Sequence, residues 1–562
     1  GVALSGAGAG TVNTFARSTT ARIRNQADVQ SGGAVSILAL NESLIVSVAG
    51  AVAASGAGGA GGGVTGQAGG SVATSAIDAS VLAEISDSTV AAMGTVDVLA
   101  EARGESVTVA IGFAAGGSGG AVGGVQLSAA GSMVGTGIGH TVQARVLNSS
   151  LTTPGNVNVI ATNAAQIVSF AGGSTGGGSG GAVGGVAGAV GASLAINVLT
   201  STLDAVIDNS VISSGGDILV LAESRGDIYS VTIGFAGTGS GGAGGGISIS
   251  LAGAGSVNTV VNDLTAEIRG GSVVTANGSD LRVETIDRTQ VVAVAGGIAA
   301  SGAGGAVGGI SGQAGSSIAT TVVANTLTAA IRNSNVNAVR DVFVGSFSDT
   351  EIVTVAIGFA AGGSGGAVGG IQIAAAGSGV ASAVDNHLMA GITGSTLQIS
   401  GRLDVLARDE SRVGAYAGGA SAGGAGGAGG GVAGAVGASS AVTVLTNTIQ
   451  AWVADSQITA NGAVHIRAVS DGELLGVSIG FAAGGAGGLV GGLNFSGAGA
   501  ISTNTVVKTV EALVTDSSIH SLAGDLLIEA LDHTDILAVV GGAAVGVAGI
   551  GAGITGQVGA SI

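Results

Sequence analysis

Cysteine is absent from the chain, which excludes disulfide bonds and thiolate metal sites but leaves the cellular compartment open, since exported proteins need not contain disulfides. Aromatic residues are almost absent too, with one Trp, two Tyr and nine Phe among 562 residues. Charged residues make up 9% of the chain, against about 25% in soluble domains. The core must therefore be built from many Val, Ile, Leu and Ala side chains packed at close range.

Basic residues are scarcer than acidic residues. Lys508 is the only lysine, and 34 acidic residues against 16 basic ones give a net charge of −18. Nucleic-acid-binding proteins present a basic face that displaces counterions from phosphates. The sequence therefore argues against a nucleic-acid partner, whereas an acidic surface keeps a long polymer soluble and attracts divalent cations.

Runs of large apolar residues long enough to span a membrane are missing. The uncharged stretch 146–203 is rich in Gly, Ala, Ser and Thr rather than Leu, Ile and Phe, and its Gly-Gly steps would break a spanning helix. We therefore do not expect the chain to span a membrane.

Glycine is abundant instead, with 112 residues, and it recurs in blocks. The stretch Val231–Ser256 reads VTIGFAGTGSGGAGGGISISLAGAGS, and close copies begin at Val107, Val353 and Leu475. Counting the looser copies, the first glycines of the nine blocks are Gly50, Gly112, Gly172, Gly234, Gly296, Gly358, Gly418, Gly480 and Gly541. The interval of about 61 residues is too regular for separate domains. It predicts one continuous repeat array over 1–562, with partial units at both ends, as in a piece of a longer polypeptide.

Every second block is the closer match. These blocks carry Ile-Gly-Phe-Ala, and the residues that mark the repeat are Gly112, Phe113, Gly234, Phe235, Gly358, Phe359, Gly480 and Phe481. The full period is thus a pair of about 122 residues. We expect such alternation if successive units face opposite sides of the long axis.

Each unit combines a Gly block, a Thr- and Val-rich stretch and a short pattern such as Ala205–Ala222, AVIDNSVISSGGDILVLA. Apolar residues alternate in that pattern, a polar corner interrupts them, and a Gly-containing turn precedes the last strand. This order, without helix-forming runs, predicts an all-β, elongated parallel β-solenoid. With roughly 20 residues per coil, each unit would form three coils, and nine units would extend about 130 Å. The small side chains would let sheets approach closely.

Polar residues recur at fixed places in the units. Charged groups such as Glu223–Asp227 and Arg408–Arg412 are interpreted as exposed corners. Corner acids at Asp208, Asp455 and Asp516 are replaced elsewhere by Asn. The recurring asparagines Asn197, Asn258, Asn325, Asn386, Asn447 and Asn504 favour an amide ladder along the axis, with a polar binding stripe as the alternative.

No motif for catalysis is present, and we predict that the chain is not an enzyme. The Gly-rich strings lack the Gly-Lys-Ser/Thr ending of a phosphate loop. The histidines are scattered: His140, His387, His465, His520 and His533. We predict no cofactor, and calcium is the one candidate, without the tandem Gly-Gly-x-Gly-x-Asp repeat that would bind it.

A resemblance adds to this interpretation. Units such as Ala83–Ala100 combine Ala-x-Ile-x-x-Ser-x-Val with a Gly turn and Val-x-Val-x-Ala, and a Val-rich run into a Gly block follows. This combination resembles the repeat region of giant bacterial surface proteins, the filamentous adhesins of the leukotoxin-like and filamentous-haemagglutinin-like kind. The resemblance implies export to the cell surface and a β-helical shaft with adhesive or filament-forming work.

The sequence therefore predicts a structural filament or adhesin shaft, extracellular or on the bacterial cell surface, that forms homo-oligomers or polymers through Gly/Ala-rich faces. One alternative is a binding module that holds surface glycans or a protein ligand of a host or neighbouring cell on its polar corners. A second alternative is a membrane-active or pore-forming repeat protein.

Overall fold

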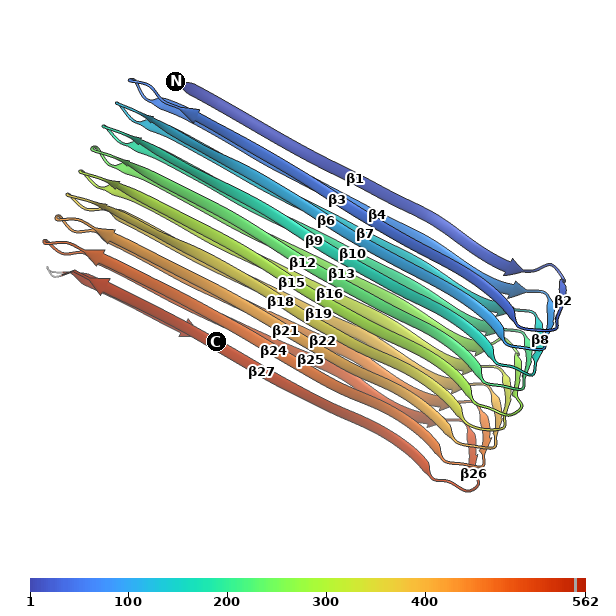
Figure 1. Ribbon diagram of the computed structural model, residues 1–562. Coiled ribbons are helices and arrows are strands. Elements are labelled where there is room, and N and C mark those ends of the chain that lie inside the picture. The colour runs from blue at the N-terminus through green and yellow to red at the C-terminus, as the bar shows by residue number, and fades with distance from the viewer. Residues whose placement is uncertain (550–552) are drawn as a thin grey trace.

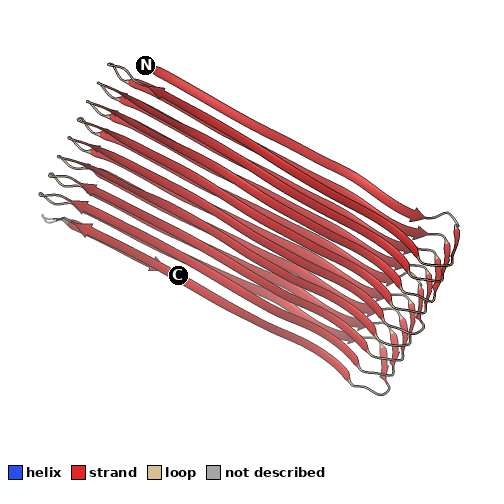
Figure 2. Ribbon diagram, in the orientation of Figure 1, coloured by secondary structure: helices blue, strands red, loops and turns tan. Residues whose placement is uncertain are grey.

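The computed structural model describes residues 1–549 and 553–562, and in that part every regular element is a strand (Figures 1 and 2). The strands form three parallel sheets, here called A, B and C, of ten, nine and nine strands. All neighbouring strands within a sheet run parallel, and each is paired with the equivalent strand of the next repeat. The prediction of an all-β parallel β-solenoid is therefore confirmed.

Sheets A and C consist of long strands, and sheet B of short ones. Sheet A contains β1 (Val2–Ile23), β4 (Gly63–Ser86), β7 (Gly124–Leu147), β10 (Gly185–Asp208), β13 (Gly246–Arg269), β16 (Gly309–Arg332), β19 (Ile371–Thr393), β22 (Val432–Ala454), β25 (Leu493–Thr515) and β28 (Ile554–Ser561). Sheet B contains β2 (Asp28–Ser31), β5 (Thr89–Ala92), β8 (Ser150–Thr153), β11 (Val211–Ser214), β14 (Val273–Ala276), β17 (Asn335–Ala338), β20 (Thr396–Ile399), β23 (Gln457–Ala460) and β26 (Ser518–Ser521). Sheet C contains β3 (Val35–Ala57), β6 (Val96–Gly120), β9 (Val157–Gly181), β12 (Ile218–Gly242), β15 (Leu281–Gly305), β18 (Val342–Gly366), β21 (Leu403–Gly426), β24 (Val464–Gly487) and β27 (Leu526–Ala548).

Each repeat unit forms a single coil, so the prediction of three coils per unit is wrong. Gly112 pairs with Gly173, one unit further along the chain, and the rest of the two strands follows in register. Within the long strands the glycines do not interrupt the coil, because their backbones are hydrogen-bonded to the neighbouring coils. In the Gly blocks the chain turns only between sheets C and A, where glycines such as Gly123 have a positive φ. Nine coils at about 4.8 Å rise only about 43 Å along the axis, not about 130 Å.

Successive units face the same side of the axis, so the expectation that they face opposite sides is also wrong. Gly112 and Gly173 lie side by side on one sheet, and their neighbours Phe113 and Ser174 do too. The 122-residue period is an alternation between adjacent coils on one face.

The molecule is a flat slab that is wider than it is long in the axial direction. A strand of 25 residues such as β12 spans about 80 Å. In Figure 1 the short strands β2, β8 and β26 lie at one end of the slab, and narrow turns join sheets C and A at the other. We call these the corner end and the turn end.

The core changes in character between the two ends. At the corner end, large aliphatic side chains such as Ile207, Ile212 and Ile218 fill the space between the three sheets. Toward the turn end, the inward residues shrink mostly to Ala, Gly, Ser and Thr, and the backbones of sheets A and C touch. A Cβ on Gly234 would lie 2.1 Å from the carbonyl oxygen of Gly253 in the facing sheet. The small residues thus let two layers of one molecule approach closely.

Candidate interaction surface

Charge is confined to one side of the slab. All Asp, Glu, Lys and Arg residues lie in the second halves of the sheet A strands, in sheet B, in the first halves of the sheet C strands or in the segments that join them. The uncharged intervals are 43–77, 106–144, 146–203, 228–262, 289–331, 352–384, 413–454 and 474–507. Each of them includes the turn end of one coil, so this half of the slab has no charged side chain. We call it the uncharged half.

In the uncharged half, the usual distribution of polar and apolar residues is reversed. On β12, Ser230 and Thr232 point inward and are fully buried, whereas Ile233 and Phe235 point outward and are 39% exposed. Sheet A repeats the reversal, since Ser248 and Ser250 are buried while Ile249 is exposed. Apolar side chains that face outward over so large an area make this half the candidate interaction surface.

The residues that mark the repeat divide between the two faces of sheet C. The marker glycines point inward and contact sheet A, as Gly112 and Gly358 do at Gly131 and Gly377. The marker phenylalanines point outward, and Phe113, Phe235, Phe359 and Phe481 are 39 to 40% exposed. The Ile-Gly-Phe motif therefore combines an inner contact between sheets with an outer apolar face.

The charged groups lie on the outer face of sheet C and not at corners, which corrects the interpretation from sequence. Arg225 lies in the first half of β12, on its outer face, and is exposed. Ion pairs link neighbouring coils along this belt, for example Arg103 with Glu42 at 3.1 Å. Asp409 is a further correction, because it points inward and is fully buried. Its neighbours Arg408 and Glu410 face outward, so the alternation in the strand already distinguishes it.

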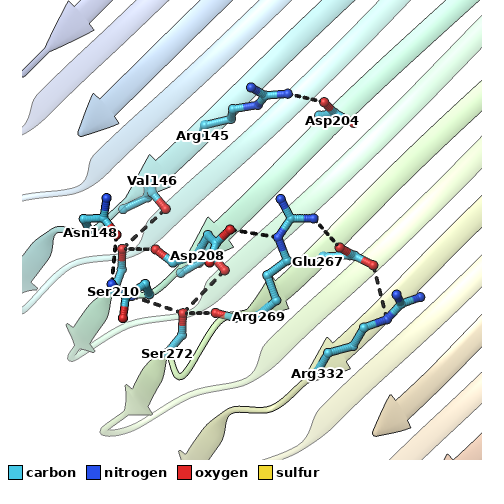
Figure 3. A network of polar contacts seen from close by, with 12 residues as sticks. Arg145, Val146, Asn148, Asp204, Asp208, Ser210, Glu267, Arg269, Ser272 and Arg332 are labelled. Atoms are coloured by element: carbon cyan, nitrogen blue, oxygen red, sulfur yellow. Dashed lines mark hydrogen bonds and ion pairs between the residues drawn. The ribbon is translucent and has the colours of Figure 1, made fainter. Parts of the chain in front are cut away.

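The corner between sheets A and B is formed by an Asn/Asp/Gly-Ser step (Figure 3). Asn209, not Asp208, adopts the left-handed conformation with φ of 46°, so the predicted corner position is wrong by one residue there. Asp455 and Asp516 do occupy this position, with φ of 49° and 47°. Asn and Asp tolerate this conformation because their short polar side chains bond locally.

A serine follows the corner residue and links each coil to the next. The hydroxyl of Ser272 donates to the carbonyl oxygen of Arg269 at 2.6 Å and accepts from the backbone N–H of Ser210 at 3.2 Å. Ser210 does the same for Ser149. On the outside, Arg269 joins Asp208 and Glu267, both at 2.9 Å (Figure 3).

Replacing Ser272 by Ala is expected to lower the free energy of unfolding by about 2 kcal/mol, because the buried N–H of Ser210 loses its acceptor. Urea unfolding followed by circular dichroism measures this. The matched control is Ser213→Ala, a serine of β11 whose side chain is not fully buried, and an equal loss there would contradict the role of the corner serine.

The recurring asparagines form an internal ladder in two rows, but the ladder is interrupted, because Asn386 and Asn447 donate to Asp409 and not to each other. Asn197 donates to Asn258 at 2.8 Å, and both are fully buried. In the second row Asn262 donates to Asn325 at 3.1 Å. The ladder faces inward, so the alternative of an exposed binding stripe does not apply to these residues. Asn504 lies in the first row, where the hydroxyl of Thr443 donates to it.

Two buried carboxylates, Asp287 and Asp409, accompany the second row, and no sequence pattern predicted them as a pair. Asp287 accepts hydrogen bonds from Asn262 at 2.8 Å and Asn325 at 2.9 Å. Burial raises its pKa to about 7, and hydrogen bonds from Thr289 and Asn262 oppose the shift. Burial likewise raises the pKa of Asp409 to about 6. These carboxylates border the uncharged half from inside.

The histidines stand apart from one another. His140 is buried and hydrogen-bonded to Asn163, and burial lowers its pKa. His465 lies 3.0 Å from Asp404, and His387 and His533 have one aspartate partner each. Over residues 1–549 and 553–562, no three His, Asp or Glu side chains gather as a metal site would require. The described part of the chain also has no helix suited to crossing a bilayer.

An open groove follows the axis along the turns. It has a volume of about 1190 Å³, and stacked turn residues such as Val122, Val183 and Val307 form one wall. The strand starts Val125 and Ile247 line the other side. The groove belongs to the uncharged half and continues its apolar surface to the edge of the slab.

No family model matches the sequence, and neither a curated protein nor a solved structure matches it.

Proposed function

We propose that the chain is a shaft segment of an extracellular bacterial filament or adhesin, and that copies associate laterally through the uncharged half. The resemblance of the repeat to giant bacterial surface proteins supports the location. The reversed polarity of the uncharged half carries the proposal. Its inward Gly and Ala residues form the contact between sheets A and C inside the slab. The associating face therefore consists of the outward Val, Ile, Leu and Phe residues.

The coil gives such a shaft stiffness and extent. Each long strand is hydrogen-bonded along its whole length to the coils on both sides. No coil in the interior of the array has an unpaired edge, and the energy of stacking adds from coil to coil. The charged belt keeps the other half hydrated and limits association there.

A membrane-active role is the second candidate, since an apolar exterior around a polar interior also suits a lipid environment. Release of a dye from liposomes tests it. The structural role predicts no release, whereas release at low protein concentration would favour the membrane-active role.

We expect the chain to form layered or filamentous assemblies by electron microscopy and to sediment as oligomers. Ile233→Asp with Ile357→Asp places two charges on the uncharged face and is expected to weaken association by at least about tenfold, because the charges would be desolvated in the interface. Sedimentation velocity measures the change, and circular dichroism verifies folding.

The matched control is Val211→Asp with Val273→Asp. These valines are 51% and 41% exposed on sheet B, outside the uncharged half. The control is expected to associate like the parent chain. Equal weakening by both double variants, or a parent chain that remains a monomer, would contradict the proposed function.

A further inference from the structure

One row on each outer face alternates strictly between glycine and a large apolar residue. On sheet C, paired residues follow one another along the axis as Gly50, Ile111, Gly172, Ile233, Gly296, Ile357, Gly418, Ile479 and Gly541. On sheet A the row is Leu4, Gly66, Leu127, Gly188, Ile249, Gly312, Ile373, Gly434, Phe495 and Gly556. Each face is thus corrugated, with ridges about 9.6 Å apart.

The stacking of coils does not require these glycines. In the interior, Ile207, Ile268, Ile331 and Ile392 stack in four consecutive coils without a small residue between them. On the outer face of sheet C there is also room. A Cβ on Gly296 would meet no atom closer than 4.0 Å, and one on Gly50 would meet none within 4 Å. Gly172 is the exception, because a Cβ there would lie 3.1 Å from the ring of Phe170.

The grooves at Gly50, Gly296, Gly418 and Gly541 therefore remain open for something outside the molecule. The ridges beside them are exposed, with Ile233 at 39% and Ile357 at 50%. A fluid lipid phase adapts to any apolar surface and does not require a fixed alternation. A rigid partner whose own ridges are about 9.6 Å apart does require a fixed alternation. A second copy of this chain has ridges at that spacing.

We propose that sheet C of one copy packs face to face on sheet C of a second copy, with the isoleucine ridges of each seated in the glycine grooves of the other. The two copies are then displaced by an odd number of coils. This inference rests on the proposed function and adds the register of association. Contact between identical faces is the commonest arrangement in homo-oligomers.

The available area is sufficient for a stable pair. From Val231 to the turn, the uncharged face of sheet C spans about 40 Å along the strands, and nine coils rise about 43 Å. With the copies displaced by one coil, eight coils face each other over about 38 Å, which gives about 1,500 Å² on each partner, nearly twice the 800 Å² per partner of a standard interface. The absence of charged residues there leaves no charge to be desolvated.

Single cysteines test the register, because the chain has no cysteine of its own. Full-length Ile233→Cys is mixed with Gly172→Cys or with Gly296→Cys, and disulfide formation is followed under mild oxidation. We expect these Ile–Gly pairs to cross-link at least about tenfold faster than Ile233→Cys with Ile357→Cys or Gly172→Cys with Gly296→Cys, because only facing positions bring the Cα atoms within reach.

The outcomes separate the two proposals. Oligomers that persist by sedimentation while all pairs cross-link equally, or while Ile–Ile pairs are fastest, would overturn the register but not lateral association. A parent chain that stays monomeric would overturn both. Co-sedimentation with phosphatidylcholine vesicles without any cross-link would assign the face to lipid and overturn the pairing.

Discussion

Replacing Gly297 by Val is expected to lower the free energy of unfolding by at least about 4 kcal/mol, at the extreme end for one substitution. A Cβ at this position would lie 2.0 Å from the carbonyl oxygen and 2.8 Å from the nitrogen of Ser316 in the facing sheet. Both atoms belong to the backbone of β16, so no rotation of a side chain relieves the overlap. The sheets would have to separate, and the neighbouring small-residue contacts would be lost.

The preceding residue provides the control. Gly296 lies on the same strand but points outward, and a Cβ there would be 4.0 Å from its nearest neighbour. Gly296→Val is expected to unfold at the same urea concentration as the parent chain or a higher one, because valine favours extended backbone more than glycine does. Equal losses in the two variants would show that the sheets are not in close contact at Gly297.

The period and the class of fold were predictable because both depend on local patterns. Alternating apolar residues, the polar corner and the turn of Ala205–Ala222 correspond to β10, the corner at Asn209, β11 and the start of β12. The size of the coil was not predictable in this way. Glycine usually signals a turn, and the Gly blocks do contain the turns between sheets C and A. Most of their other glycines stay in strands because of hydrogen bonds to neighbouring coils, and only the full stack supplies those bonds.

The sequence alone also could not predict which face of each strand points into the core. Alternation places Ile233 and Phe235 on one side and Gly234 on the other, but it does not state which side is the interior. Large apolar residues normally mark the core, and here Gly and Ala do, because two backbones in contact leave no room for more. The burial of Asp409 could have been predicted, because alternate residues of a strand face opposite sides, and Asp409 lies between the outward-facing Arg408 and Glu410.

The stability of the chain is expected to fall as pH rises from about 4 to about 7, and Asp287 is the main reason. Its carboxyl group is fully buried, and burial raises its pKa to about 7 from the ordinary value of about 3.9 for Asp. Between these values the folded chain retains a proton that the unfolded chain releases, so rising pH favours unfolding. The full difference is about 4 kcal/mol at pH 7 and above.

Asp287→Asn is expected to flatten this dependence, most clearly between pH 6 and 7, when urea midpoints are measured from pH 4.5 to 8. Asp409→Asn is the matched comparison. Burial raises the pKa of Asp409 only to about 6, and the Lys508 charge is among the effects that oppose the shift. The contribution of Asp409 to the pH dependence of stability is therefore complete near pH 6. Removing Asp409 should therefore leave the loss of stability between pH 6 and 7 unchanged. A parent chain equally stable at pH 5 and pH 8 would show that the Asp287 carboxylate is not held away from water, and that the polar ladder beside it opens to solvent.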